Sequence, residues 1–99
     1  MTMQLLDIRM NDGSRHFSEL PEAVGFDEIR QHSAQLAGAI ETGFISDDVT
    51  EMWLDLEYRG HAFSVNNQFG DYWFFVRDPE CANPILSEIG NHFSSLLCK

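Results

Sequence analysis

Cysteine, basic residues and long apolar runs are all scarce in this chain of 99 residues. Its only cysteines, Cys81 and Cys98, cannot form a framework of several disulfides, so we expect a reduced, cytoplasmic protein. No apolar run approaches the roughly 20 residues that a membrane-spanning helix needs. The N-terminal stretch has no basic region followed by an apolar core, which predicts that the chain carries no signal peptide.

The shortage of basic residues limits the kinds of partner that this chain can bind. Six Lys and Arg residues stand against 16 Asp and Glu residues, and the formal net charge is −10. Nucleic acids and anionic membrane surfaces attract proteins mainly through Lys and Arg, so neither is expected as a partner. The acidity favours solubility, and it would also speed the encounter with a basic protein.

Residues that could hold a metal or perform catalysis show no recognisable spacing. The four histidines are His16, His32, His61 and His92, and no two of them stand four residues apart as ligands on one helix would. Neither cysteine has an adjacent histidine that would activate its thiol. We therefore predict no metal, no cofactor and no catalytic residue.

The clearest pattern runs from Met52 to Asp78 and predicts a three-stranded antiparallel meander. Residues 52–59 alternate between apolar and polar, which is typical of a half-buried strand. Arg59-Gly60 then suits a two-residue turn, because glycine adopts positive φ cheaply. Closing a hairpin there pairs Leu56 with Phe63, and the apolar residues of both strands fall on one side without adjustment.

The meander has two faces, which we call face one and face two. A second turn at Gly70-Asp71 would place Val76 beside Val65. The third strand then adds its alternating residues to face one and face two. Face one is the predicted core face and holds Met52, Leu54, Leu56, Tyr58, Phe63, Val65, Tyr72, Phe74 and Val76. Face two holds Trp53, Asp55, Glu57, Arg59, Ala62, Ser64, Asn66, Gln68, Trp73, Phe75 and Arg77.

Face two carries the strongest indication of function. In the predicted register Trp53, Asn66 and Phe75 form one row across the strands, and Trp73 lies beside them next to Gln68. Surface aromatic residues within a polar rim are typical of protein contacts. Four alternatives remain open: cover by the N-terminal segment of the same chain, by a second copy in a homodimer or by a different protein, or simple exposure to solvent.

Helical periodicity and turn signals complete the predicted fold. A helix is expected over residues 27–42, and a second helix should begin at Asn83-Pro84, where asparagine caps and proline suits the first turn. Residues 4–10 and 15–17, around the turn residues 11–13, could add an N-terminal strand or hairpin. The expected fold is thus a single α+β domain over residues 1–99, with both helices on face one.

A cluster of carboxylates precedes the meander and continues along its first strand. Its members are Asp47, Asp48, Glu51, Asp55 and Glu57.

Together these patterns favour a small protein-binding or adaptor module that acts through its sheet face. A second hypothesis is an acidic inhibitor, an immunity-type protein or a secretion chaperone, whose carboxylate cluster would meet a basic partner. A third is a small enzyme with a pocket near Tyr58, His61 and Tyr72.

Overall fold

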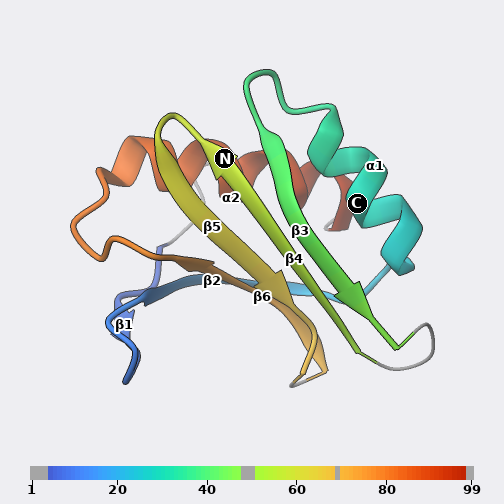
Figure 1. Cartoon of the computed structure of the whole chain (residues 1–99), viewed down its shortest axis with the longest axis horizontal. Helices are drawn as coiled ribbons and strands as arrows, with labels where there is room; N and C mark the ends of the chain where they lie inside the picture. Colours follow the sequence, from blue (N-terminus) through green and yellow to red (C-terminus); the bar gives the residue numbers. More distant parts are fainter. Residues whose placement is uncertain (1–4, 48–50, 69, 98–99) are drawn as a thin grey trace.

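Six antiparallel strands form one sheet in the order β1-β2-β6-β5-β4-β3 in the computed structural model, which describes residues 5–47, 51–68 and 70–97 (Figure 1). The elements in chain order are β1 (Ile8–Arg9), β2 (Arg15–Pro21), α1 (Phe26–Ala34), β3 (Ile40–Ser46), β4 (Met52–Tyr58), β5 (His61–Asn66), β6 (Asp71–Val76) and α2 (Asn83–Leu97). The α+β class is confirmed, but the sheet is twice as wide as the predicted three-stranded meander.

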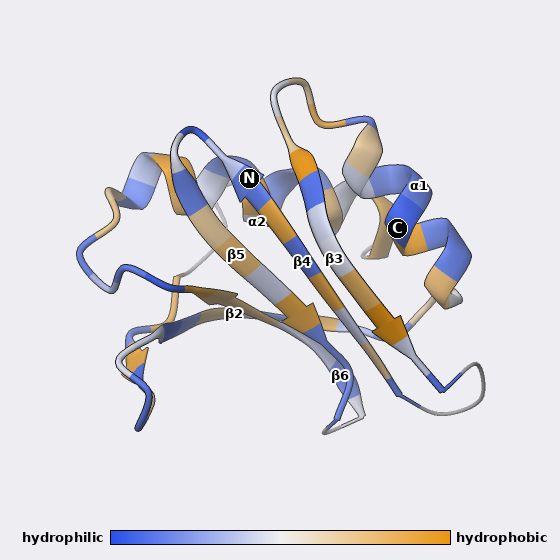
Figure 2. Cartoon of the chain, in the orientation of Figure 1, coloured by the Kyte–Doolittle hydropathy of each residue, from blue (hydrophilic) through white to orange (hydrophobic). Residues whose placement is uncertain are grey.

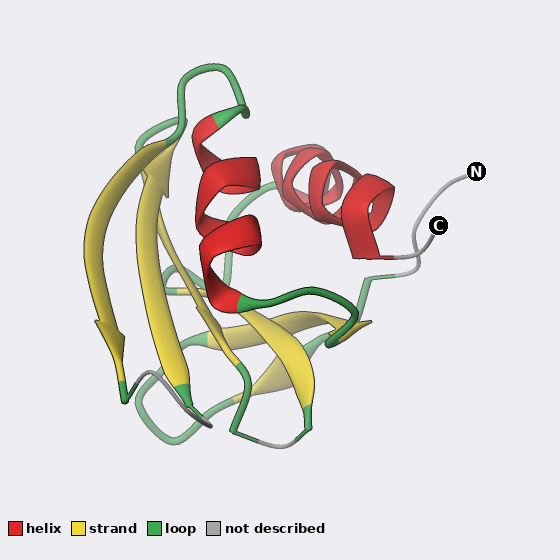
Figure 3. Cartoon of the chain, turned by 90° about the vertical axis from the view of Figure 1, so that its right-hand side faces the viewer, coloured by secondary structure: helices red, strands yellow, loops and turns green. Residues whose placement is uncertain are grey.

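Face one is the core face, as predicted. All nine residues assigned to it are buried, and both helices lie on that side of the sheet (Figure 3). Helix α1 contributes Ile29 to the core, and α2 contributes Leu86, Ile89, Phe93 and Leu97. No helix among the described residues is long and apolar enough to cross a membrane.

The hairpin of β4 and β5 has the predicted register. Leu56 pairs with Phe63 and Trp53 pairs with Asn66. Arg59 and Gly60 have φ angles of 51° and 80°, the left-handed conformation that a two-residue turn with the twist of the strands requires.

The predicted register between β5 and β6 is wrong by two residues. Val65 pairs with Phe74, and Trp73, rather than Phe75, stands opposite Asn66. The reason is that Asn67 does not continue β5, because its side chain bonds elsewhere. Its Oδ1 accepts a hydrogen bond from the Met52 amide at 2.9 Å, and its Nδ2 donates to Glu22 at 2.9 Å. A shift of two residues leaves every side chain on its predicted face, because the side-chain period is two.

The predicted helix over residues 27–42 is too long. Helix α1 ends at Ala34, and Ile40–Ser46 form β3, the strand at one edge of the sheet. Gly38, with a φ of 90°, turns the chain between the two elements.

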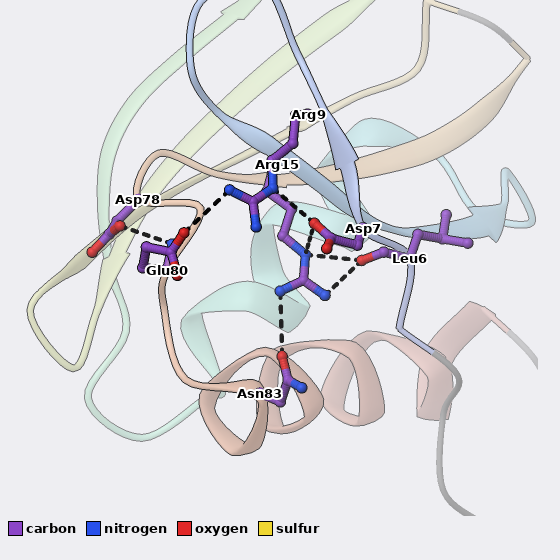
Figure 4. Close-up of polar contacts among 7 residues, drawn as sticks. All are labelled: Leu6, Asp7, Arg9, Arg15, Asp78, Glu80 and Asn83. Carbon is purple, nitrogen blue, oxygen red and sulfur yellow. Dashed lines mark hydrogen bonds and ion pairs between the residues drawn. The ribbon is translucent and has the colours of Figure 1, made fainter.

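The N-terminal hairpin is confirmed for β1 and β2, although β2 runs on to Pro21 and pairs with β6. The expected strand start at Gln4 lies outside the described residues. Buried Arg15 holds this segment in place (Figure 4): its guanidinium donates to the Leu6 carbonyl at 2.7 and 2.9 Å and to Asn83 Oδ1 at 3.3 Å. The edge hairpin is thereby tied to the start of α2.

Candidate functional site

A groove of about 860 Å³ crosses face two, on the side of the sheet opposite the helices. The turn between β1 and β2 forms one wall, and the strands from β6 to β3 form the floor. The lining residues are Met10, Asn11, Asp12, Ser14, Thr42, Trp53, Asp55, Ala62, Phe63, Ser64, Asn66, Gln68, Phe75 and Arg77. The groove therefore has a floor on which aromatic and polar side chains are mixed, and a polar rim.

Trp53 is the most exposed aromatic residue that was assigned to the patch. It projects from β4 with 38% of its surface exposed, and its cross-strand neighbours are Asn66 on β5 and Ile45 on β3. Ile45 is 71% exposed, so the two side chains form a partly solvated apolar pair. Asn66 itself is buried, and it lines the groove between Trp53 and Trp73.

The other two predicted aromatic residues are partly covered by a residue of the same chain. His16 on β2 stacks on Trp73 with ring centroids 4.3 Å apart and lies 5.1 Å from the Phe75 ring. The N-terminal segment thus covers this half of the patch and leaves Trp53 open. The predicted homodimer through face two stays a prediction.

His16 is itself unusual, because it is fully buried although it lies on the side of the sheet opposite the helices. Its Nε2 lies 3.1 Å from the Ser18 carbonyl oxygen, so the ring donates from that atom, and its buried Nδ1 has no hydrogen-bond partner. Burial lowers the pKa of His16, against the opposing attraction of Glu19. Sequence reasoning missed this residue, because it reaches the aromatic rings only through the pairing of β2 with β6.

The predicted acidic surface is divided along β4. Asp55 lines the groove, where its carboxylate accepts a hydrogen bond of 2.6 Å from the Ser64 hydroxyl, and Glu57 is exposed on the same face. Asp47 instead accepts a hydrogen bond from the Glu51 amide at the far end of the strand. Asp48 lies outside the described residues.

The residues of the proposed enzyme pocket do not come together. Tyr58 and His61 are cross-strand partners beside the turn between β4 and β5. Tyr72 lies at the opposite end of the sheet, where it pairs with Leu20 and donates to the Val24 carbonyl at 2.7 Å. Burial raises the pKa of Tyr72, so its hydroxyl stays protonated.

No three His, Cys, Asp or Glu side chains of the described ranges are grouped closely enough to hold a metal ion. The groove offers hydrogen-bond donors and acceptors, an exposed indole, two carboxylates and one guanidinium. This set of groups suits recognition of another polypeptide. In comparisons with protein family models, curated proteins and solved structures, none matches the chain.

Proposed function

We propose that this protein is a protein-binding module that holds a segment of a partner in the groove on face two. The observation that carries the proposal is the open groove with Trp53 at 38% exposure on its floor. A tryptophan whose remaining surface can be buried against a partner is typical of the residues that dominate binding energy. The polar rim would pair with backbone and side-chain groups of the bound segment.

The charge of the site supports a basic partner. Asp12 and Asp55 line the groove against a single Arg77. Glu57 is exposed on β4, and Glu51 is exposed just before that strand begins. The whole chain carries a net charge of −10, so the long-range field also favours a positive ligand. The preferred segment would combine an apolar side chain for Trp53 with Lys or Arg for the carboxylates.

Selection from a phage-displayed random peptide library on the immobilised full chain tests this proposal. Enriched peptides should contain both apolar and basic residues, and Trp53→Ser should weaken their binding by about 30-fold or more, as loss of a tryptophan hot spot does. The matched control is Ile8→Ser, because Ile8 is 47% exposed at the other edge of the sheet. Equal binding by wild type and Trp53→Ser, or no enrichment over the bare support, would contradict the proposal.

A second candidate function is an acidic inhibitor, an immunity-type protein or a secretion chaperone. The exposure of Asp55 and Glu57 on β4, and of Glu51 just before it, favours it. Here the carboxylates, rather than Trp53, would supply most of the recognition. Replacing all three by their amides should then slow association with the selected basic peptides and remove most of its salt dependence, because exposed charges are screened within about 8–10 Å at ordinary ionic strength. Salt-independent binding would rule this candidate out.

A further inference from the structure

The two edges of the sheet differ sharply in their protection. At one edge, β1 pairs with only two residues of β2, and β2 itself ends in Pro21, a residue type that commonly protects an exposed edge. At the other edge, β3 has seven residues and pairs only with β4. From Ile40 to Ile45 its outer side pairs with no described strand, so the backbone groups on either side of the register shift between Glu41 and Gly43 form a template for an added strand.

The side chains of β3 do not blunt this edge. The strand contains neither lysine nor proline, the residues that commonly protect exposed edges. Its one charged side chain, Glu41, is held by Arg30 of α1 through two hydrogen bonds of 2.9 Å. The same guanidinium lies 4.0 Å from the centre of the Phe44 ring, so α1 lies next to β3 (Figure 1), on the side of the sheet that both helices cover (Figure 3).

A bulge at Thr42 shapes an apolar ledge on the other side of the strand. The register shifts between Glu41 and Gly43, which brings Ile40 and Ile45 onto the same face although five positions separate them. Apolar residues accordingly mark both ends of β3 (Figure 2). Ile40 is 63% exposed and Ile45 is 71% exposed, and Trp53 on β4 adjoins Ile45. We call these three residues the β3 ledge.

The charges around this edge are predominantly negative. Glu57 pairs with Ile40 and Asp55 with Gly43 on face two, while Glu41 and Asp27 lie near Arg30 on the face-one side. Four carboxylates therefore surround the edge against one guanidinium. Two copies of this edge would repel each other, whereas a basic strand would be attracted.

We propose that the β3 edge accepts an extended basic segment of another protein as a seventh strand of the sheet. Apolar side chains of the segment would cover the β3 ledge, and basic side chains would alternate with them. This inference goes beyond the proposed function, because it assigns recognition to the β3 backbone rather than to the groove. Strand addition obtains affinity from main-chain hydrogen bonds and specificity from alternate side chains.

The first test uses a short synthetic peptide that alternates valine and lysine, titrated into the isotope-labelled full chain. The amide signals of β3 should shift, while those of β1 and of the groove turn at residues 10–14 should not. A fully N-methylated version keeps every side chain and charge but cannot donate a backbone hydrogen bond. Its affinity should therefore be lower by a factor of about ten or more. Equal affinity of the two peptides would overturn strand addition, and shifts confined to the groove would do the same.

The second test changes Ile40 and Ile45, the two ledge residues that do not line the groove. Ile45→Lys and Ile40→Lys should each weaken binding of the parent peptide by about tenfold, since each replaces apolar contact with repulsion between cations. Ile8→Lys, at the β1 edge, is the matched control and should bind as the wild type does. A wild-type dimer in sedimentation that Ile45→Lys converts to a monomer would show that a second copy occupies the edge, and would overturn the proposal.

Discussion

His32 and His92 each hydrogen-bond to the main chain of the other. The Nε2 atom of each ring lies 2.6 Å from the carbonyl oxygen of the other residue, and the two rings stack with centroids 4.0 Å apart. A carbonyl oxygen can only accept, so both rings must carry hydrogen on Nε2. This reciprocal pair connects the end of α1 to α2, the two helices that cover face one.

The histidine pair should make the stability of the protein depend on pH. Burial lowers the pKa of His92 from its usual 6.5; the hydrogen bond to His32 opposes this change, and the charge of His32 adds to it. Above pH 6.5 the ring is neutral in both the folded and the unfolded chain. Below pH 6.5 the unfolded chain binds the proton before the folded chain does. The free energy of unfolding therefore decreases by up to about 1.4 kcal/mol for each unit by which the pH is lowered. Urea unfolding between about pH 7.5 and 5.5 measures this slope, and His92→Asn should reduce it. An unchanged slope in His92→Asn would contradict the assignment.

His16 should contribute to the same acid sensitivity at a different place. Its pKa is also lowered, mainly by burial, so its contribution is complete above pH 6.5 and decreases as the pH falls toward the lower pKa of the folded state. His16→Phe keeps a ring against Trp73 and removes the unpaired Nδ1, at the cost of the contact with Ser18. We expect its stability at neutral pH to stay within about 1.5 kcal/mol of wild type, the worth of one hydrogen bond, and its acid slope to be smaller. A slope as steep as that of wild type would place the titrating group elsewhere.

The meander was predictable because two independent signals agree on it. The alternation from Met52 to Arg59 defines the faces, and Arg59-Gly60 closes a hairpin that keeps both apolar sets on one side. The β5–β6 register was not predictable, because it depends on the side chain of Asn67 bonding to Met52 and Glu22, which are distant in sequence. Strand β3 was missed because Ile29, Leu36 and Ile40 also match helical spacing.

The candidate site was predictable only in part, for a similar reason. Trp53, Trp73 and Phe75 could be assigned to one face from alternation alone. The cover that His16 gives to Trp73 and Phe75 depends on β2 pairing with β6, and a contact between elements so far apart in the chain leaves no local pattern. The exposure of Ile45 beside Trp53 followed only once β3 was known to be a strand.

The core face should tolerate truncation poorly at its centre. Leu56 is 1% exposed and pairs with Phe63, so Leu56→Ala should lower the free energy of unfolding by about 2–5 kcal/mol, as other buried leucine truncations do. The neighbouring Glu57 is exposed, and Glu57→Ala is the control, with an expected change within about 0.5 kcal/mol. Chemical denaturation of both variants measures the difference. A loss below about 0.5 kcal/mol in Leu56→Ala would place this residue outside the core.

The turn between β4 and β5 should be far more sensitive to a change at Gly60 than to a change at Arg59. Gly60 has a φ of 80°, so Gly60→Val forces a β-branched residue into the left-handed region and should cost about 1–3 kcal/mol. Arg59 already occupies that region with a φ of 51°, where asparagine is preferred in a two-residue turn. Arg59→Asn relieves backbone strain but removes the exposed ion pair with Glu88, so the net change should stay within about 1 kcal/mol. The denaturant midpoints of the two variants measure both changes in stability, provided that the free energy of unfolding keeps the same slope against denaturant concentration. Equal losses in the two variants would show that the turn does not depend on the left-handed conformation of Gly60.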